Sequence, residues 1–444
     1  MVKIGFVSLG CAKNIVDTEV MLGYLAEADV EVTNDPGKAD VIVINTCGFI
    51  DKAKEESINT ILEMASYKEN GNCKRLVVAG CLVERYRDQI MGQLPEIDAV
   101  IGLDQLSDIV QVCTGDLAGF HGGTGEASTY LYNHENRRVL TTPGYSAYIK
   151  IAEGCNHSCS FCVIPSIRGR FRSRQPDSVL REAEILAGQG VKELNLVAQD
   201  STLYGNDLKI REGLSSLLRD LCCVDGINWI RFLYTYPNSI TPALLETVAE
   251  NSKICNYVDV PLQHVSCSVL CDMNWGGSPE AYRDLIRRIR STVPDVAVRT
   301  TFIVGFPGET EDDFKELSDF VGEMRFDHLG VFSYSDEEGS AACKHGNKVP
   351  DSLKQERLDQ LMSMQAGISL ENNKCKIGRS CTVLVDGVSE ETDMLWEGRL
   401  PGQAPDIDGV VYINDGIDES VRPGDFRTVK ISEAFEYDLV GGLE

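Results

Sequence analysis

Apolar residues recur in short runs of strand length, and longer stretches of mixed polarity separate them. Near the start of the chain five runs have this length: 3–8, 30–33, 41–45, 75–79 and 99–101. The stretches 15–28 and 52–67 between them have helical length. This alternation predicts a mostly parallel sheet with helices on its faces.

Residues 114–146 interrupt the alternation. Five glycines fall within eleven residues here, at Gly115, Gly119, Gly122, Gly123 and Gly125, and few large apolar residues follow them. A composition rich in glycine and poor in apolar residues is typical of a linker. We therefore expect a first domain at 1–114 and a linker at 115–140.

A second series of strand and helix patterns follows the linker. Its six candidate strands are 147–152, 193–198, 229–235, 257–260, 296–305 and 329–333. Six parallel strands over about 200 residues are too few for the closed eight-fold barrel, which typically needs about 250 residues. The pattern predicts a six-fold partial barrel at 141–374, with a closing helix at 350–373.

The last seventy residues change character again. Short apolar runs at 382–385, 394–400, 410–413, 428–431 and 437–440 are separated by Gly, Asp and Pro turns. This spacing predicts a small antiparallel β-barrel at 375–444. The fold class expected for the whole chain is α/β, with a parallel-sheet domain, a partial barrel and a β-barrel in that order.

The composition, 43% hydrophobic and 25% charged residues, is that of a folded protein and excludes wholesale disorder. No apolar run approaches the roughly 20 residues of a membrane helix, and no basic region or cleavage site precedes the first strand. We therefore expect a cytoplasmic protein. The net charge of −26 predicts repulsion from nucleic acid and attraction to a basic protein.

Sixteen cysteines are many for such a chain, and in a reducing compartment clustered cysteines indicate metal or redox chemistry. Cys155, Cys159 and Cys162 form the pattern C-x3-C-x2-C directly after the first barrel strand. Three thiolates on one short loop can bind three of the four irons of a cubane cluster and leave one iron open. A zinc knuckle is the alternative, but such sites use a second cysteine pair, and none lies nearby in the sequence.

Cys11, Cys47 and Cys81 each follow a predicted strand of the first sheet. The carboxyl ends of parallel strands meet at one edge of a sheet, so these thiols are expected to converge although 36 and 34 residues separate them. Three unrelated loop thiols are the alternative.

Two motifs resemble those of the radical S-adenosylmethionine (SAM) enzymes. The segment GCNHSCSFC at 154–162 is similar to their cluster loop, and RTTFIVGFPGET at 299–310 is similar to their SAM-contact strand. The resemblance implies that the open iron binds the amino and carboxylate groups of SAM, and that an electron cleaves SAM to a 5′-deoxyadenosyl radical. It implies SAM contacts at Phe161, Gly305, Gly308 and Glu309.

The whole chain resembles the methylthiotransferases, in which a domain with an auxiliary [4Fe–4S] cluster precedes a radical SAM barrel and a TRAM domain. The implied cofactors are therefore SAM and two [4Fe–4S] clusters. The implied cluster ligands are Cys11, Cys47 and Cys81 for the auxiliary cluster and Cys155, Cys159 and Cys162 for the radical-generating one.

Three segments resemble the branch that modifies the β-carbon of an aspartate in small-subunit ribosomal protein twelve: SLGCAKNIVDTE at 8–19, IPSIRGRFRSR at 164–174 and AQDSTLYG at 198–205. Ser166 and Asp200 distinguish them from the tRNA-modifying branch. The implied partners are this basic ribosomal protein, free or within the assembled subunit, and an electron donor. No direct nucleic-acid substrate and no membrane partner are expected.

Charge gives an independent argument for a protein substrate. Residues 375–444 contain fifteen acidic and six basic residues, a net charge of −9. An RNA-binding surface needs Lys and Arg to neutralise phosphates, whereas an acidic surface suits a basic protein. An acidic face that only confers solubility is the other reading of this charge.

Two alternative functions stay open. Methylthiolation of a tRNA adenosine predicts a basic C-terminal face. A non-enzymatic iron–sulfur carrier leaves the partial barrel and the motif at 299–310 unexplained. The sequence does not identify the residues that position the target aspartate.

The chain departs from the family at 266–275, where SCSVLCDMNW replaces charged residues after the motif PLQH at 261–264. Contacts that relatives make there are not carried over. His157, inside the cluster loop, is a candidate for a hydrogen bond that supports the cluster ligands. Cysteines outside the two sets are expected to be structural thiols, among them Cys267, Cys271, Cys375 and Cys381.

Overall fold

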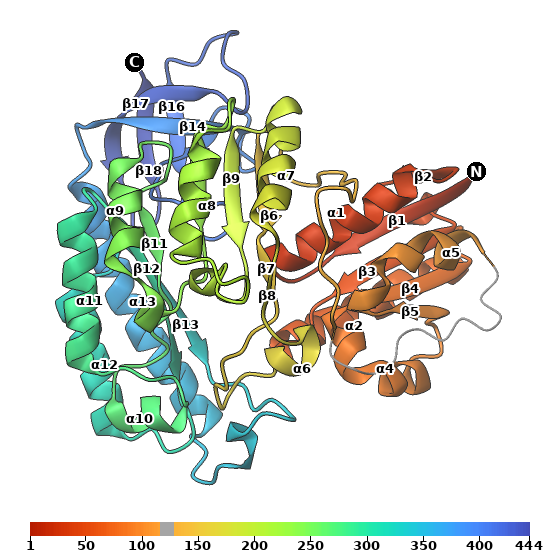
Figure 1. Ribbon diagram of the computed structural model, residues 1–444, viewed down its shortest axis with the longest axis horizontal. Helices are drawn as coiled ribbons and strands as arrows, with labels where there is room; N and C mark the ends of the chain where they lie inside the picture. The colour runs from red at the N-terminus through yellow and green to blue at the C-terminus, as the bar shows by residue number, and fades with distance from the viewer. Residues whose placement is uncertain (116–127) are drawn as a thin grey trace.

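The computed structural model describes residues 1–115 and 128–444, which form three parts in sequence order (Figure 1). An N-terminal α/β part, red to orange, lies beside a central partial barrel, yellow to teal. The chain ends in a small blue β-barrel packed on one end of the central part. No helix within these described residues has both the length and the hydrophobicity needed to cross a bilayer.

The N-terminal part is a five-stranded parallel sheet with the order β2-β1-β3-β4-β5. Its strands are β1 Val2–Ser8, β2 Val30–Thr33, β3 Val41–Thr46, β4 Arg75–Gly80 and β5 Ala99–Ile101. Its helices are α1 Ala12–Ala26, α2 Asp51–Ala65, α3 Tyr67–Asn70, α4 Cys81–Gln93 and α5 Ile109–Thr114, with the 3-10 turns η1 Pro36–Lys38 and η2 Leu103–Asp108. All five predicted strands are confirmed. Every residue of β3 is buried, as expected of a central strand covered by helices on both faces.

The central part contains six parallel strands in two sheets of three, β10-β9-β6 and β11-β12-β13. These strands are β6 Ser146–Lys150, β9 Glu193–Val197, β10 Trp229–Phe232, β11 Tyr257–Asp259, β12 Ala297–Val304 and β13 His328–Ser333. A single parallel bridge between Ile230 and Ile254 connects the two sheets. The predicted six-fold partial barrel is therefore confirmed.

Helices cover the outer face of these strands (Figure 1). They are α7 Pro176–Gly188, α8 Gly213–Cys222, α9 Pro242–Glu250, α11 Pro279–Thr292, α12 Glu311–Met324 and α13 Asp351–Lys374; the last is the predicted closing helix and packs on β13. Helix α10 Cys267–Asp272 lies at one end of the strands instead. Shorter elements are β7 Ala152–Glu153, α6 Ile164–Arg168, β8 Arg172–Ser173, η3 Ser201–Leu203, η4 Pro237–Ser239 and η5 Ala342–Lys344. Alternate residues such as Leu194 and Leu196 belong to the large apolar core with the helices, while Glu193 and Asn195 pair with polar partners on the other face.

The C-terminal part is a closed barrel with the order β14-β15-β16-β18-β17. Its strands are β14 Ser380–Val388, β15 Trp396–Arg399, β16 Val411–Asp415, β17 Phe426–Ala434 and β18 Leu439–Leu443. Four of its pairings are antiparallel, as predicted, and β16 pairs with β18 in parallel. The parallel pair follows from geometry, because an odd number of strands cannot alternate in direction all the way around a ring.

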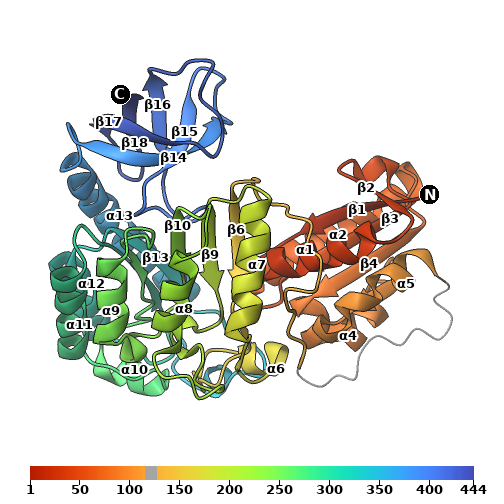
Figure 2. The same ribbon diagram turned by 45° about the horizontal axis from the view of Figure 1, so that its top comes forward.

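The C-terminal barrel is fixed to the amino ends of the central strands by a buried ion pair. Arg399 of β15 donates two hydrogen bonds of 2.9 Å to the carboxylate of Glu193, the first residue of β9. Arg231 of β10 donates to the same carboxylate at 2.5 Å. Figure 2 accordingly shows the blue barrel at the opposite end of the central strands from α6 and α10.

The predicted linker, 115–140, is partly outside the described residues, because the structure describes it only at 115 and from Ser128 onward. The part from Ser128 packs between the first two parts of the protein. Tyr132 is buried and donates a hydrogen bond to Glu182 of α7. Arg138 forms ion pairs with Glu182 and with Glu19 of α1. This stretch therefore links α1 to the central helices through buried charges.

The buried Glu193 gives a pH-dependent prediction. Burial alone would raise the pKa of Glu193, but Arg399 and Arg231 lower it to about 2. The stabilisation from the ionised carboxylate is therefore complete above its ordinary pKa of 4.5 and is lost as the pH falls toward 2. We expect Glu193→Gln to lower the free energy of unfolding of the metal-free protein by about 3 kcal/mol at neutral pH.

Denaturant titrations of wild type and Glu193→Gln at a series of pH values measure this difference, which should shrink from pH 4.5 downward. Glu184→Gln is the matched control, because Glu184 is an exposed carboxylate paired with Arg181 on α7. A difference that does not change with pH would contradict the ionised pair.

Candidate metal centres

The loop that carries Cys155, Cys159 and Cys162 follows β6 and β7 at the carboxyl end of the central strands. The backbone N–H of His157 donates to the Cys155 sulfur and that of Ile164 to the Cys162 sulfur, both at 3.4 Å. Hydrogen bonds of this kind favour the thiolate form and are typical of iron–sulfur ligands.

The same loop is anchored to the end of helix α10. The backbone N–H of Ser160 donates to the carbonyl of Met273 at 2.9 Å, and its hydroxyl donates to the carbonyl of Asp272 at 2.7 Å. Asn274 donates to the carbonyl of Ser158 at 2.9 Å. These contacts give residues 266–275 a structural role in holding the cysteine loop.

The imidazole of His157 lies between an acidic and an aromatic side chain. Its Nε2 is 2.6 Å from Oδ2 of Asp200, and its ring stacks on Tyr236 with centroids 4.1 Å apart. Asp200 itself accepts a hydrogen bond of 2.9 Å from the backbone N–H of Thr202, as the cap of η3. The hydrogen bond expected of His157 is present, and Asp200 is its partner.

The second set of cysteines follows three strands that are neighbours in the N-terminal sheet. Cys11 precedes α1 after β1, Cys47 follows β3, and Cys81 begins α4 after β4. Two close backbone approaches bring their loops together. A Cβ atom at Gly10 would lie 2.8 Å from Cβ of Cys47, and one at Gly48 would lie 2.9 Å from the carbonyl oxygen of Cys81.

Charge on Cys11 or Cys47 would raise the pKa of Cys81. Burial is the main cause that raises the pKa of Cys81 to about 12. Burial also acts on Cys11, but Lys13 and Arg168 outweigh it and lower the pKa of that thiol. A bound metal group needs thiolates, so its assembly would release protons from this set.

Four charged side chains form a buried network where the N-terminal sheet meets the central barrel. Arg168 of α6 donates to both oxygens of Glu153, at 3.1 and 3.0 Å, and to Asp17 of α1 at 3.1 Å. Lys150 at the end of β6 donates to Asp17 and to Glu153, each at 2.5 Å. Arg168 and Lys150 outweigh the effect of burial and lower the pKa of Glu153. Two carboxylates are thus neutralised by two cations away from water.

The same guanidinium reaches the second set of cysteines. Nη2 of Arg168 lies 3.3 Å from the sulfur of Cys81 and 2.6 Å from the side-chain oxygen of Asn14. Val163 and Ile167, which follow Cys162 in the chain, pack in one apolar cluster with Cys81. The residues directly after one cysteine loop therefore contact a cysteine of the other set.

The spacing of the thiols bears on the kind of metal group that they could hold. Among residues 1–115 and 128–444, no three His, Cys, Asp or Glu side chains converge closely enough to hold one metal ion. Cysteines that bind separate irons of a cubane need not converge on one point. Thiols with N–H or guanidinium donors aimed at their sulfurs are a donor set that an iron–sulfur cluster can use.

The residues expected to contact SAM lie around the same end of the barrel. Phe161 is next to Trp275, with ring centroids 6.3 Å apart, and Gly305 and Gly308 lie in the turn between β12 and α12. Glu309 is buried, and one of its oxygens accepts from the backbone N–H of Gly305 at 2.5 Å.

The other carboxylate oxygen of Glu309 accepts from Arg357 at 2.8 Å. Burial raises the pKa of Glu309 to about 7, and Arg357 opposes this shift. The Glu309 carboxylate thus holds the turn that contains Gly305, and its contact with SAM stays a prediction.

The remaining cysteines form no further site in the described part of the chain. All sixteen cysteines are free thiols. Cys267 and Cys271 are exposed on α10, and Cys375 is exposed beyond α13. No three acidic, histidine or cysteine side chains gather around them among the residues described. Their expected role as structural thiols stays a prediction, because exposed thiols are not packed in a core.

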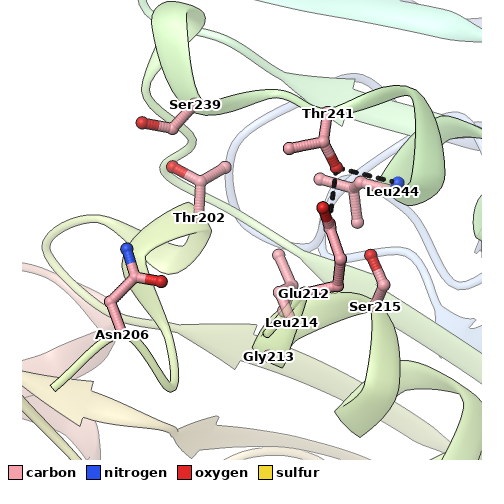
Figure 3. A pocket seen from close by; sticks show the side chains of 9 residues that line it. All are labelled: Thr202, Asn206, Glu212, Gly213, Leu214, Ser215, Ser239, Thr241 and Leu244. Carbon is pink, nitrogen blue, oxygen red and sulfur yellow. Dashed lines mark hydrogen bonds between the residues drawn. The ribbon is translucent and has the colours of Figure 1, made fainter. Parts of the chain in front are cut away.

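A surface hollow of about 240 Å³ lies over η3, η4 and the starts of α8 and α9 (Figure 3). Its polar groups serve the local structure, because the Thr241 hydroxyl donates to Glu212 at 2.8 Å and accepts from the backbone N–H of Leu244 at 3.2 Å. None of the six candidate ligand cysteines lines it.

Sequence reasoning assigned no role to Arg168 and no partner to His157. Arg168 lies in the segment at 164–174 that carried the resemblance. Its position shortly after a cysteine loop could have suggested a role near the cysteines. Asp200 lies in the segment at 198–205 that also carried the resemblance, but nothing in the sequence pairs it with His157, which it meets only in the fold.

Comparison with protein families gives three matches along the chain. Residues 3–102 match the family described as Uncharacterized protein family UPF0004, residues 149–321 match the Radical SAM superfamily, and residues 377–443 match the TRAM domain.

Several similar proteins bear the name Ribosomal protein uS12 methylthiotransferase RimO. The protein from Solibacter usitatus (strain Ellin6076) is 51% identical over 99% of this chain and 94% of that relative. The one from Koribacter versatilis (strain Ellin345) is 48% identical over 99% of this chain and 96% of its own length. The one from Desulforamulus reducens (strain ATCC BAA-1160 / DSM 100696 / MI-1) is 46% identical over 100% of both chains.

Solved structures with a similar fold include two radical SAM proteins. The methyltransferase TsrM from Kitasatospora setae, with cobalamin and a [4Fe–4S] cluster bound, matches with a TM-score of 0.54 and 16% identity over 75% of this chain and 74% of that chain. The cobalamin-dependent enzyme OxsB matches with a TM-score of 0.50 and 13% identity over 82% of this chain and 56% of that chain. At these identities the likeness concerns the fold alone.

The buried network gives a stability prediction. Arg168→Met leaves Glu153 and Asp17 with Lys150 as their nearest cation, so the metal-free variant should lose about 3–5 kcal/mol in free energy of unfolding. Denaturant titration measures the loss. Arg181→Met, at an exposed pair with Glu184, should change the stability by less than about 0.5 kcal/mol. Equal effects of the two substitutions would show that the Arg168 contacts are not stabilising.

Proposed function

The chain belongs to the ribosomal protein uS12 methylthiotransferase family, and from this premise we propose that it transfers a methylthio group to the β-carbon of an aspartate in uS12. The observation that carries the proposal is the identity of 46–51% with these relatives over nearly the whole length of both chains. The order of the three family matches supports it. The protein is a transferase of the radical SAM type.

Membership of the Radical SAM superfamily implies one [4Fe–4S] cluster and SAM. We assign the ligands of that cluster to Cys155, Cys159 and Cys162. The place of their loop at the carboxyl end of the barrel and the N–H donors to two of the sulfurs support this assignment. Phe161, Gly305, Gly308 and Glu309 stay candidates for contact with SAM.

We further propose a second [4Fe–4S] cluster on Cys11, Cys47 and Cys81. Its support is the convergence of three strand ends in the N-terminal sheet and the guanidinium of Arg168 at the sulfur of Cys81. A buried cation that donates to sulfur stabilises a negatively charged thiolate set.

The reaction needs cofactors because the β-carbon of aspartate carries an unactivated C–H bond. When bound, the radical-generating cluster would supply the electron that cleaves SAM to a radical. A second SAM would provide the methyl group, and the auxiliary cluster would provide the sulfur. The chain itself supplies placement and exclusion of water. Val163 and Ile167, after one cysteine loop, pack in one apolar cluster with Cys81 of the other set, which supports a substrate residue that lies between the two sets.

The proposed partner is the basic protein uS12, free or in the assembled subunit, with an electron donor. The C-terminal barrel carries an excess of acidic residues, and Arg399, one of its few cations, is buried against Glu193. Such a surface favours a basic protein over RNA. The basic face that the tRNA alternative predicts is not supported by this charge distribution.

An anaerobic assay with SAM and a reductant, offered uS12 and tRNA in parallel, tests the substrate. We expect a methylthio mass gain on an aspartate of uS12, read by mass spectrometry, and none on tRNA. A gain on tRNA alone would replace the proposal with its nucleic-acid alternative, and SAM binding with no gain on either substrate would leave it unsupported.

The two cysteine sets should have separate roles, one in SAM cleavage and the other in sulfur insertion. We expect Cys159→Ala to abolish both SAM cleavage and methylthiolation, because the radical source is lost. Cys11→Ala should keep part of the SAM cleavage and abolish sulfur insertion. Product analysis for 5′-deoxyadenosine and for modified uS12 measures both activities.

Cys223→Ala, at an exposed cysteine of the central barrel, is the matched control and should keep both activities and the iron content of the wild type. Each ligand substitution should lower the bound iron from about eight atoms toward about four, since each cubane holds four irons. Loss of SAM cleavage in Cys11→Ala, with the other cluster intact, would contradict separate roles for the two cysteine sets.

A further inference from the structure

The side chain of Lys13 is a buried cation with no hydrogen-bonded anionic partner among the described residues. It extends from the first turn of α1, two residues after Cys11, and is 8% exposed. Its ammonium lies 3.4 Å from the ring centroid of Tyr234. Within residues 1–115 and 128–444 it donates no hydrogen bond and forms no ion pair, and it donates to none of the cysteine sulfurs.

Tyr234 places this ammonium at the mouth of the central barrel. Tyr234 follows β10 at its carboxyl end, and its backbone N–H donates to Asp259 at the end of β11 at 2.8 Å. Its carbonyl accepts from the backbone N–H of Ser201 at 2.9 Å, directly after Asp200, the partner of His157 in the cysteine loop. Lys13 therefore reaches from the N-terminal sheet toward the barrel end that carries the other cysteine set.

Burial would lower the pKa of Lys13, but charge on Tyr234 or Cys11 outweighs it and raises that pKa. The carboxylates near Lys13 already have other partners. Asp17 and Glu153 are already paired with Lys150 and Arg168 at 2.5–3.1 Å. Lys13 is thus a third cation beside two neutralised carboxylates. A buried cation is costly unless an anion joins it, and the ring of Tyr234 offsets only part of this cost. Lys13 can therefore pair with a carboxylate that arrives with a ligand.

We propose that Lys13 binds the side-chain carboxylate of the target aspartate, and this inference rests on the proposed function. The β-carbon of aspartate is bonded directly to the carboxylate carbon, so a charge-assisted hydrogen bond to that carboxylate fixes the reacting carbon within one bond. The position of Lys13, beside Cys11 and facing the barrel mouth, places that carbon between the two cysteine sets.

Two other anions could use the same ammonium: the carboxylate of SAM and the thiolates of the Cys11 set. Arg168 already donates to the sulfur of Cys81, whereas Lys13 donates to no sulfur in the described chain and lies over Tyr234 of the barrel. This difference favours the substrate carboxylate. The experiment distinguishes the three candidate anions: the substrate carboxylate, the SAM carboxylate and the cysteine thiolates.

The test compares the affinity of the reconstituted holoenzyme for uS12 and for uS12 in which the target aspartate is replaced by asparagine. Asparagine keeps the shape and removes the charge. We expect the wild type to bind the aspartate form about 10- to 100-fold more tightly, the range of a hydrogen bond to a charged group. Lys13→Met should bind both forms equally, and Lys13→Arg should restore a preference for aspartate. Anaerobic titration calorimetry measures the dissociation constants.

The iron content and the SAM affinity of Lys13→Met show whether Lys13 instead interacts with the Cys11 set or with SAM. Both should equal those of the wild type. Loss of about half the iron would assign Lys13 to the Cys11 set, and weaker SAM binding with an intact aspartate preference would assign it to SAM; either result overturns the inference.

An equal affinity of the wild-type enzyme for both forms of uS12 would overturn the inference without any enzyme variant, so the test does not depend on how Lys13→Met folds. Failure of the proposed function is recognised separately. In that case the wild-type holoenzyme would add no methylthio mass to uS12. If only this inference fails, the mass gain remains and the preference for aspartate does not depend on Lys13.

Discussion

The guanidinium of Arg168 lies where the N-terminal sheet meets the central barrel, and it contacts Cys81 of one cysteine set and Glu153, which precedes the loop of the other set. It neutralises Glu153, two residues before Cys155, and it donates to the sulfur of Cys81. Because these charges are buried, separating the two parts would expose or unpair them at a cost of several kcal/mol. The mutual position of the two sets is therefore fixed by an interaction that neither part can satisfy alone, and apolar contacts of Val163 and Ile167 reinforce it.

This arrangement suits a reaction in which the protein contributes placement and the cofactors contribute reactivity. A carbon radical reacts with whatever lies nearest, so the source of the radical and the source of sulfur have to be close before the reaction starts. The ion pairs between Arg138, Glu19 and Glu182 tie α1 to the central helices beside the same boundary. Rigid coupling of the two parts is thus distributed over two buried networks.

The sequence was sufficient to predict the strands and the two cysteine sets, because both depend on local patterns. Hydrophobic runs mark parallel strands, and the strand-end rule brings Cys11, Cys47 and Cys81 to one edge. Long-range pairing was beyond such patterns. The parallel contact of β16 with β18 follows from ring closure, and the partners of Arg168 come from segments that only the fold brings together. Glu309 shows a further limit, since its motif suggested SAM contact while its carboxylate holds the turn at Gly305.

The C-terminal barrel is anchored through Glu193 and Arg399 at the amino ends of the central strands, whereas both cysteine sets lie toward their carboxyl ends. The longest of these strands, β12, has eight residues and so spans about 25 Å. A macromolecule that touches the acidic barrel and also delivers a residue to the cysteines has to extend along that length. One segment of the partner would then bind the acidic barrel, and another would carry the modified residue. A short fragment around the modified residue would lack the contacts with the distant acidic surface.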